Sequence, residues 1–152
     1  MVVLLLALLA VDRPALPAFA LPDLQGKTVR LEAGQVTVLS FWATWCVPCL
    51  QELGHLQEFA QANPDKKFTL LAIATDGPQT LSQVRSVARQ KKWSMPVLLD
   101  SAGSVSAVLN PRGVTPYTIF VDKRGGVAHR HEGFAAADGV MYQTWIKALL
   151  DE

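Results

Sequence analysis

The chain has 152 residues, of which 50% are hydrophobic and 18% are charged, and its formal net charge is +1. This composition indicates one globular domain with a sizeable core and excludes an intrinsically disordered protein. A nearly neutral chain without a basic block gives no indication of a nucleic-acid partner. Its two cysteines are too few for a scaffold with several disulfides, so a close pair is better interpreted as reactive.

The N-terminal segment, residues 1–16, begins with the apolar run MVVLLLALLAV. This run is too short to span a bilayer, and no Lys or Arg precedes it as in a typical signal peptide. Three interpretations of residues 1–16 stay open: a trimmed export signal or anchor, a short uncleaved anchor, or an additional folded element. The globular domain is predicted to span residues 17–152.

Beyond an extended, proline-containing lead-in, apolar and β-branched runs alternate with segments of helical periodicity. The order is β-α-β-α-β, followed by a hairpin and a closing helix. It predicts an α/β fold, a three-layer sandwich whose central mixed sheet carries helices on both faces. The predicted strands are Thr28–Leu31, Val36–Trp42, Phe68–Ala74, Val97–Leu99, Tyr117–Asp122 and Val127–Phe134, and the predicted helices are Val47–Ala62, Gln79–Lys92, Ser101–Leu109 and Asp138–Leu150.

Both cysteines occur in the run FWATWCVPC, between a predicted buried strand and the helix that follows it. Two intervening residues allow the sulfurs of Cys46 and Cys49 to meet over the first helical turn. The free amides and the dipole at the helix start favour a thiolate on Cys46. We therefore expect a dithiol/disulfide switch in which Cys46 attacks and Cys49 resolves the mixed disulfide. A zinc site is the alternative, but zinc needs about four ligands and the chain has no second cysteine pair.

A wider set of segments carries a family resemblance: LPDLQGKTVRL, VTVLSFWATWCVPCLQEL, VLLD, GVTPYTIFVD and the late Gly133. Together they resemble the extracytoplasmic TlpA/ResA-like branch of the thioredoxin-like superfamily, over roughly Pro17 to Leu150. The resemblance implies a thioredoxin-like fold and a thiol-disulfide oxidoreductase with no cofactor beyond its redox-active disulfide.

The same resemblance implies partners and a location. The expected partners are client proteins with disulfides or CxxC motifs, and a membrane electron-transfer protein that acts as reductant. The expected location is the periplasm or the outer face of the cytoplasmic membrane, with or without a membrane anchor. Members of this branch often act in cytochrome c maturation.

The resemblance also assigns candidate client-binding residues. Pro116, after Thr115, matches the cis proline that faces the dithiol in thioredoxin folds and leaves the neighbouring backbone free to pair with an extended client. We expect Trp45, Pro48, Thr115 and Pro116 to contact the client. An ordinary trans proline at a strand start is the alternative.

One departure from the thioredoxin pattern bears on proton transfer. Ser40 occupies the strand position where thioredoxin has a buried Asp beneath its second cysteine. Glu52, three residues after Cys49 on the same helix, is then the nearby candidate for a general base on Cys49. An exposed helix glutamate without a role is the alternative, because exposed glutamates are common.

The last predicted strand contains two histidines. His129 and His131 alternate along the last predicted strand and therefore share a face. No carboxylate spacing completes a metal site with them, so none is predicted.

The direction of exchange depends on a reduction potential that sequence does not fix. A disulfide-forming oxidase and a non-catalytic chaperone or binding module thus stay open beside the reductase.

Overall fold

The computed structural model describes residues 11–152, so the apolar run of residues 1–10 and its three interpretations lie outside the described residues. Within residues 11–152, no helix has the length and apolar character needed to cross a membrane. The strands are β1 (Leu21–Pro22), β2 (Thr28–Val29), β3 (Thr37–Trp42), β4 (Thr69–Ala74), β5 (Val97–Leu99), β6 (Tyr117–Val121) and β7 (Val127–Glu132), and the helices are α1 (Val47–Ala62), η1 (Pro78–Thr80), α2 (Leu81–Gln90), α3 (Ser104–Leu109) and α4 (Asp138–Asp151).

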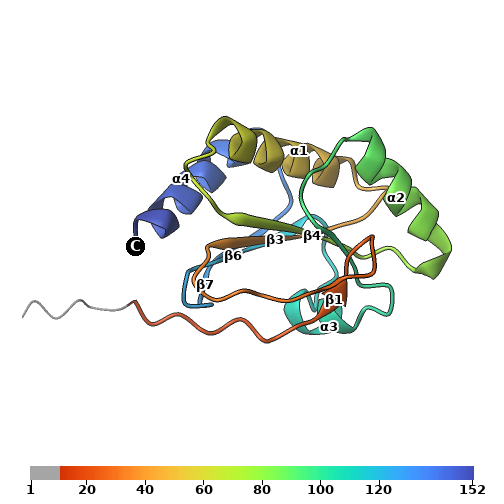
Figure 1. Cartoon of the computed structure of the whole chain (residues 1–152), viewed down its shortest axis with the longest axis horizontal. Coiled ribbons are helices and arrows are strands. Elements are labelled where there is room, and N and C mark those ends of the chain that lie inside the picture. Colours follow the sequence, from red (N-terminus) through yellow and green to blue (C-terminus); the bar gives the residue numbers. More distant parts are fainter. Residues whose placement is uncertain (1–10) are drawn as a thin grey trace, which may run out of the picture.

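The central sheet has five strands in the order β5-β4-β3-β6-β7. β3 lies in the middle and pairs in parallel with β4 and antiparallel with β6, so the sheet is mixed. Helices α1, α2 and α4 cover one face, whereas α3 and the N-terminal lead-in with β1 cover the other (Figure 1). The predicted α/β three-layer sandwich is therefore confirmed.

The side chains of β3 point alternately to the two faces of the sheet, so this strand contributes to a hydrophobic core on each face. All six residues of β3 are buried, because the strand is covered on both faces. Val38 and Trp42 pack in the core beneath α1 and α4, whereas Leu39 and Phe41 pack in the core on the opposite face. Ser40 shares its face with Val38 and Trp42, so the strand directs this hydroxyl toward α1.

Several predicted elements are shorter in the structure, among them α3, which begins at Ser104, and β7, which ends at Glu132. The reason is identifiable for α2 and β2. Helix α2 begins at Leu81 because Pro78–Thr80 forms a separate 3₁₀ turn before it. The strand expected over Thr28–Leu31 contains two residues, because it pairs only with β1 in a separate two-stranded sheet. Neither difference affects the segment that carries the cysteines.

Residues 13–16, assigned by sequence to the N-terminal segment, run along the turn between β6 and β7. The amide of Leu16 donates to the carbonyl of Gly125 at 2.9 Å, and the amide of Val127 donates to the carbonyl of Pro14 at 2.8 Å. Because Val121 pairs with Thr37, this turn lies at the amino end of β3, opposite the end that leads to the cysteines. The division of the chain at residue 17 stays a prediction.

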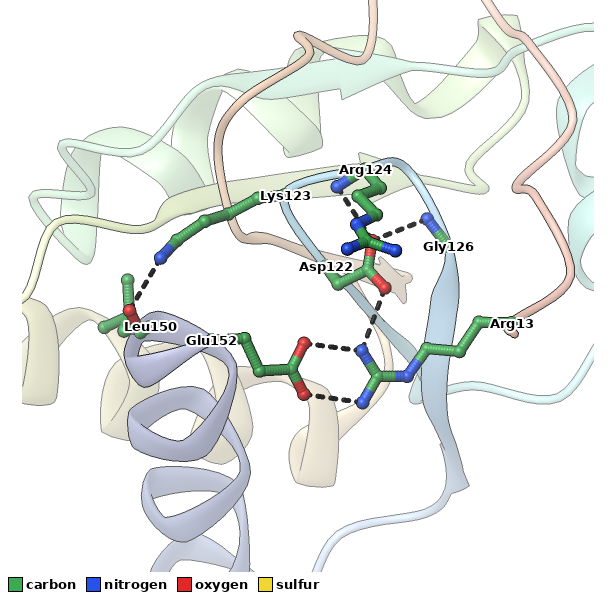
Figure 2. Close-up of polar contacts among 7 residues, drawn as sticks. All are labelled: Arg13, Asp122, Lys123, Arg124, Gly126, Leu150 and Glu152. Atoms are coloured by element: carbon green, nitrogen blue, oxygen red, sulfur yellow. Dashed lines mark hydrogen bonds and ion pairs between the residues drawn. The ribbon is translucent and has the colours of Figure 1, made fainter. Parts of the chain in front are cut away.

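An ion-pair cluster of Arg13, Asp122 and Glu152 fixes both ends of the described chain to this turn (Figure 2). The Arg13 guanidinium donates to both Glu152 carboxylate oxygens at 2.7 Å and to Asp122 Oδ2 at 2.9 Å. The other oxygen of Asp122 accepts the amides of Arg124 and Gly126, each at 2.8 Å. The cluster thus joins the lead-in, the hairpin turn and the end of α4.

Candidate active site

The two cysteines form a disulfide at the start of α1, with their Cα atoms 5.3 Å apart. Cys46 is the N-cap residue, and its sulfur accepts the amide of Cys49 at 3.3 Å. Cys46 is 4% exposed and Cys49 is completely buried, which is the expected order of accessibility. When the disulfide is reduced, the same amide and the helix dipole stabilise a thiolate on Cys46.

The loop between β3 and Cys46 is held by Asp76, which follows β4. One carboxylate oxygen of Asp76 accepts the amide of Thr44 at 3.0 Å, and the other accepts the Thr44 hydroxyl at 2.6 Å. Thr80 also donates to Asp76, at 3.1 Å. Asp76 therefore fixes the backbone two residues before Cys46. Sequence analysis assigned no role to Asp76.

The Thr115–Pro116 peptide bond is cis, so this prediction is confirmed. Tyr117, the first residue of β6, pairs with Phe41 near the end of β3. Pro116 therefore lies at the end of the sheet from which the cysteine loop departs. Pro116 is buried and Thr115 is half-buried.

The residues that flank the cysteines form an exposed rim. Trp45 is 76% exposed, Val47 is 62% exposed, and Pro48 is exposed as well. Single exposed apolar side chains are common on protein surfaces, but these three are neighbours and flank the reactive pair. The rim is suited to contact with another polypeptide.

Glu52 is completely buried, so the alternative of an exposed helix glutamate is wrong. Its Oε1 accepts the hydroxyls of Ser40 at 2.6 Å and Thr118 at 2.7 Å, and its Oε2 accepts the Tyr142 hydroxyl at 3.0 Å. These donors come from β3, β6 and α4. Ser40, at the position where thioredoxin has its buried Asp, therefore binds a carboxylate supplied by α1.

Burial raises the pKa of the Glu52 carboxyl above its ordinary value. The hydroxyls of Ser40, Thr118 and Tyr142 oppose this shift, as does the nearby charge of His131, but burial is the larger effect. Burial and the neighbouring carboxylate also raise the pKa of Tyr142, so its hydroxyl remains a proton donor. A carboxyl group that retains its proton to a higher pH is suited to proton transfer near neutrality.

Sequence analysis found Glu52 but missed the donors Thr118 and Tyr142. The helical spacing contained a signal for the burial of Glu52, because this residue is three positions after Cys49 and four before Leu56, which both lie on the apolar face. Across the described part of the chain, residues 11–152, no group of three or more His, Cys, Asp or Glu side chains is arranged to hold a metal ion.

Thiol–disulfide exchange on a thioredoxin-like fold is the chemistry that this arrangement supports, and the protein is a thiol-disulfide oxidoreductase. The chain belongs to the AhpC/TSA family, whose model matches residues 13–130. The thiol-disulfide oxidoreductase ResA of Bacillus thuringiensis subsp. konkukian is 30% identical over 121 residues, which cover 77% of this chain and 67% of ResA.

Solved structures support the same assignment. A structure described as the thiol:disulfide interchange protein DsbE from Chlorobium tepidum has a TM-score of 0.82 and 28% identity, covering 93% of this chain and 99% of that one. A secreted Mycobacterium tuberculosis disulfide oxidoreductase, homologous to E. coli DsbE, has a TM-score of 0.72 and 26% identity, covering 86% and 96%.

Proposed function

We propose that this protein reduces disulfides of client proteins outside the cytoplasm. Two features observed together carry the proposal. The sulfur of Cys46, the N-cap residue, accepts the Cys49 amide at 3.3 Å, and a buried glutamate, Glu52, lies in the next helical turn. The first feature favours an attacking thiolate, and the second supplies a base for the resolving thiol.

The reaction has two exchange steps. The Cys46 thiolate attacks one sulfur of a client disulfide, forms a mixed disulfide and releases the other client sulfur as a thiolate. Cys49 then loses its proton and attacks the Cys46 sulfur, which releases the second client thiol and forms the Cys46–Cys49 disulfide. Two electrons pass to the client, and a membrane electron-transfer protein with its own dithiol returns two electrons to this pair.

Glu52 is proposed to accept the proton of Cys49 in the second step. Cys49 is buried, so it does not readily lose this proton to bulk water. Glu52 lies one turn away on α1, and we propose that the proton passes to it directly or through one water molecule. Ser40 and Thr118 both donate to Glu52 Oε1, which holds the carboxylate in a fixed orientation.

Client binding is assigned to the exposed rim and to the segment before β6. Trp45 and Pro48 offer apolar contact beside Cys46, and Thr115 and Pro116 precede the strand at the same end of the sheet. An extended client segment that pairs with this backbone presents its disulfide to Cys46.

Two observations support an extracytoplasmic location. The similar Mycobacterium tuberculosis oxidoreductase, whose alignment covers 86% of this chain, is described as secreted, and residues 1–10 form an apolar run. Compartments outside the cytoplasm are where client disulfides form and persist. The proposal extends to a membrane anchor in the apolar run of residues 1–10, before the bonded residues 13–16, and to apocytochrome c, with its CxxC motifs, as one client class.

The test is reduction of insulin disulfides by the wild type and by Cys46→Ser, Cys49→Ser, Glu52→Gln and Glu58→Gln variants. We expect Cys46→Ser to be inactive and Cys49→Ser to accumulate a mixed disulfide. Glu52→Gln should slow exchange by about 10- to 100-fold, whereas Glu58→Gln, an exposed glutamate of the same helix, should match the wild type.

The reduction potential of the pair decides the direction. A potential near that of thioredoxin, at about −270 mV, supports the reductase, whereas one near about −120 mV indicates an oxidase. A wild type that neither reduces nor forms disulfides indicates a binding module and contradicts the proposal.

A further inference from the structure

His131 is adjacent to two of the three residues whose hydroxyls donate to Glu52. On β7 it is directly opposite Thr118 of β6, which donates to Glu52. Its ring also packs edge-on against the ring of Tyr142, with the ring centroids 5.5 Å apart and the planes at 85°. Tyr142 donates to the other oxygen of Glu52, so His131 is next to both donors.

The other side of His131 reaches the protein surface. Its Nε2 is 3.2 Å from Oδ2 of Asp138, and both side chains are about a quarter exposed, at 25% and 24%. The Asp138 oxygen also accepts the amide of Ala135 at 2.7 Å, which fixes the carboxylate in place. Solvent therefore reaches the His131 side chain, whereas Glu52 has no exposed surface.

The charged and titratable groups that face His131 come from three elements. α4 contributes Asp138 and Tyr142, α1 contributes Glu52, and β7 itself contributes His129 on the same face. His129 is stacked on Trp145 with centroids 4.2 Å apart, and burial lowers its pKa. Asp138 and Glu52 are therefore the carboxylates that face His131.

The remaining charges of β7 lie on the other face of the strand. Arg130 and Glu132 alternate with His131, and Glu132 pairs there with Arg112 at 2.8 Å. On the face of β7 toward α4, the titratable residues of the strand are His129 and His131.

We propose that His131 is a positioning residue that controls the charge of Glu52. When protonated, His131 stabilises the ionised carboxylate through the Tyr142 and Thr118 side of the network. When His131 loses its proton, Glu52 retains its own proton to a higher pH. The consequence for catalysis rests on the proposed role of Glu52 in disulfide exchange.

The decisive measurement is the titration of Glu52 in the oxidised protein, where neither cysteine titrates. Protein labelled with ¹³C at glutamate carboxyl carbons is followed by NMR from pH 4 to 9, with the signal assigned by Glu52→Gln. We expect His131→Gln to raise the Glu52 midpoint by roughly 0.5–1 pH unit. His129→Gln, a histidine on the same face two residues away, should leave it unchanged. An unaltered midpoint in His131→Gln overturns the inference.

A second variant keeps the test decisive if His131→Gln does not fold. Asp138→Asn removes the carboxylate that pairs with His131 at 3.2 Å, so it should raise the Glu52 midpoint by a smaller amount. An unchanged midpoint in Asp138→Asn contradicts the inference.

The kinetic consequence is tested by a pH profile of insulin reduction. His131→Gln should shift the acid limb upward in the wild-type background and leave the profile of Glu52→Gln unchanged. If His131→Gln shifts the acid limb equally in the wild type and in Glu52→Gln, the effect does not act through Glu52, and the inference is contradicted. A wild type without exchange activity contradicts the proposed function, while the carboxyl titration still decides the role of His131.

Discussion

Glu52 and Asp122 are two buried carboxylates near opposite ends of β3, and the structure shifts their pKa values in opposite directions. Three neutral hydroxyls hold Glu52, and burial raises its pKa. Burial also acts to raise the pKa of Asp122, but the Arg13 guanidinium and the amides of Gly126 and Arg124 together outweigh it and lower the pKa.

The difference shows that burial alone does not fix the protonation of a carboxyl group. Neutral donors satisfy the oxygens of Glu52 without removing the electrostatic penalty of its charge, so its proton remains available for exchange. A cation removes that penalty at Asp122, and the resulting carboxylate is permanently ionised near neutral pH. The first arrangement is suited to proton transfer, and the second to structural stabilisation.

The largest expected effect is the loss of Asp122. Asp122→Asn should reduce the free energy of unfolding by about 2 kcal/mol at pH 7, because Arg13 and two backbone amides lose a charged acceptor in a mostly buried site. Arg13 keeps its ion pair with Glu152. The lowered pKa means that this stabilisation is present above about pH 4, the value in unfolded chains, and is lost as pH falls through the folded pKa. Urea unfolding at pH 7 and pH 3 measures both values.

Exposed Asp12, the neighbour of Arg13, provides the control, and Asp12→Asn should change stability by less than about 0.5 kcal/mol. A deficit in Asp122→Asn that is as large at pH 3 as at pH 7 would show that the carboxylate charge does not carry the effect.

Glu52→Gln should change stability in the opposite direction. Its pKa is raised on folding, so the contribution of Glu52 is complete below about pH 4 and is lost as pH rises through the folded pKa. Glutamine still accepts from Ser40 and Thr118 and has no charge to bury. We therefore expect the oxidised variant to be about 1.5 kcal/mol more stable than the wild type at pH 8, and nearly equal to it at pH 4. A variant that is less stable at pH 8 would break the contrast with Asp122.

Removal of one neutral donor should have a smaller effect. Tyr142→Phe leaves Oε2 of Glu52 without its hydroxyl, so the pKa of Glu52 should rise further and the protein should lose about 1 kcal/mol. Thermal unfolding and the carboxyl titration measure the two changes. Tyr117→Phe removes a hydroxyl in the core on the opposite face of the sheet and should leave the Glu52 titration unchanged.

The smallest effect is expected for Glu152, the partially exposed partner of Arg13. Its side chain is 44% exposed, so water and salt screen its ion pair. Glu152→Gln should cost less than about 0.5 kcal/mol, and the difference should disappear in 1 M salt. Urea unfolding at low and high salt measures it, and a loss comparable to that of Asp122→Asn would show that the buried position of Asp122 is not what matters.

Local sequence patterns predict much of the fold, because the elements around the site are defined by short-range signals. The apolar run before the cysteines predicts β3, and the helical spacing after them predicts α1 with the bounds Val47–Ala62. The turn residues between β6 and β7 predict the hairpin. Each signal depends on neighbours within about one helical turn or one strand.

The surroundings of Glu52 could not be predicted in this way. Its donors Thr118 and Tyr142 are 66 and 90 residues away along the chain, so only the packing of β6 and α4 against α1 brings them to the carboxylate. The role of Asp122 was missed for the same reason, because Arg13 is 109 residues away. Long-range polar contacts leave no periodic trace in the sequence.

The ion pair between Arg13 and Glu152 brings the two ends of the described chain close together, since the guanidinium nitrogen and the carboxylate oxygen are 2.7 Å apart. Such a chain is suited to circular permutation. A permutant of the described residues would join Glu152 to Arg13 through a short flexible linker. The exposed turn at Pro64–Asp65, between α1 and β4, offers a place for new termini. That turn lies at the amino end of the sheet, away from Cys46, so the permuted protein should retain its dithiol chemistry.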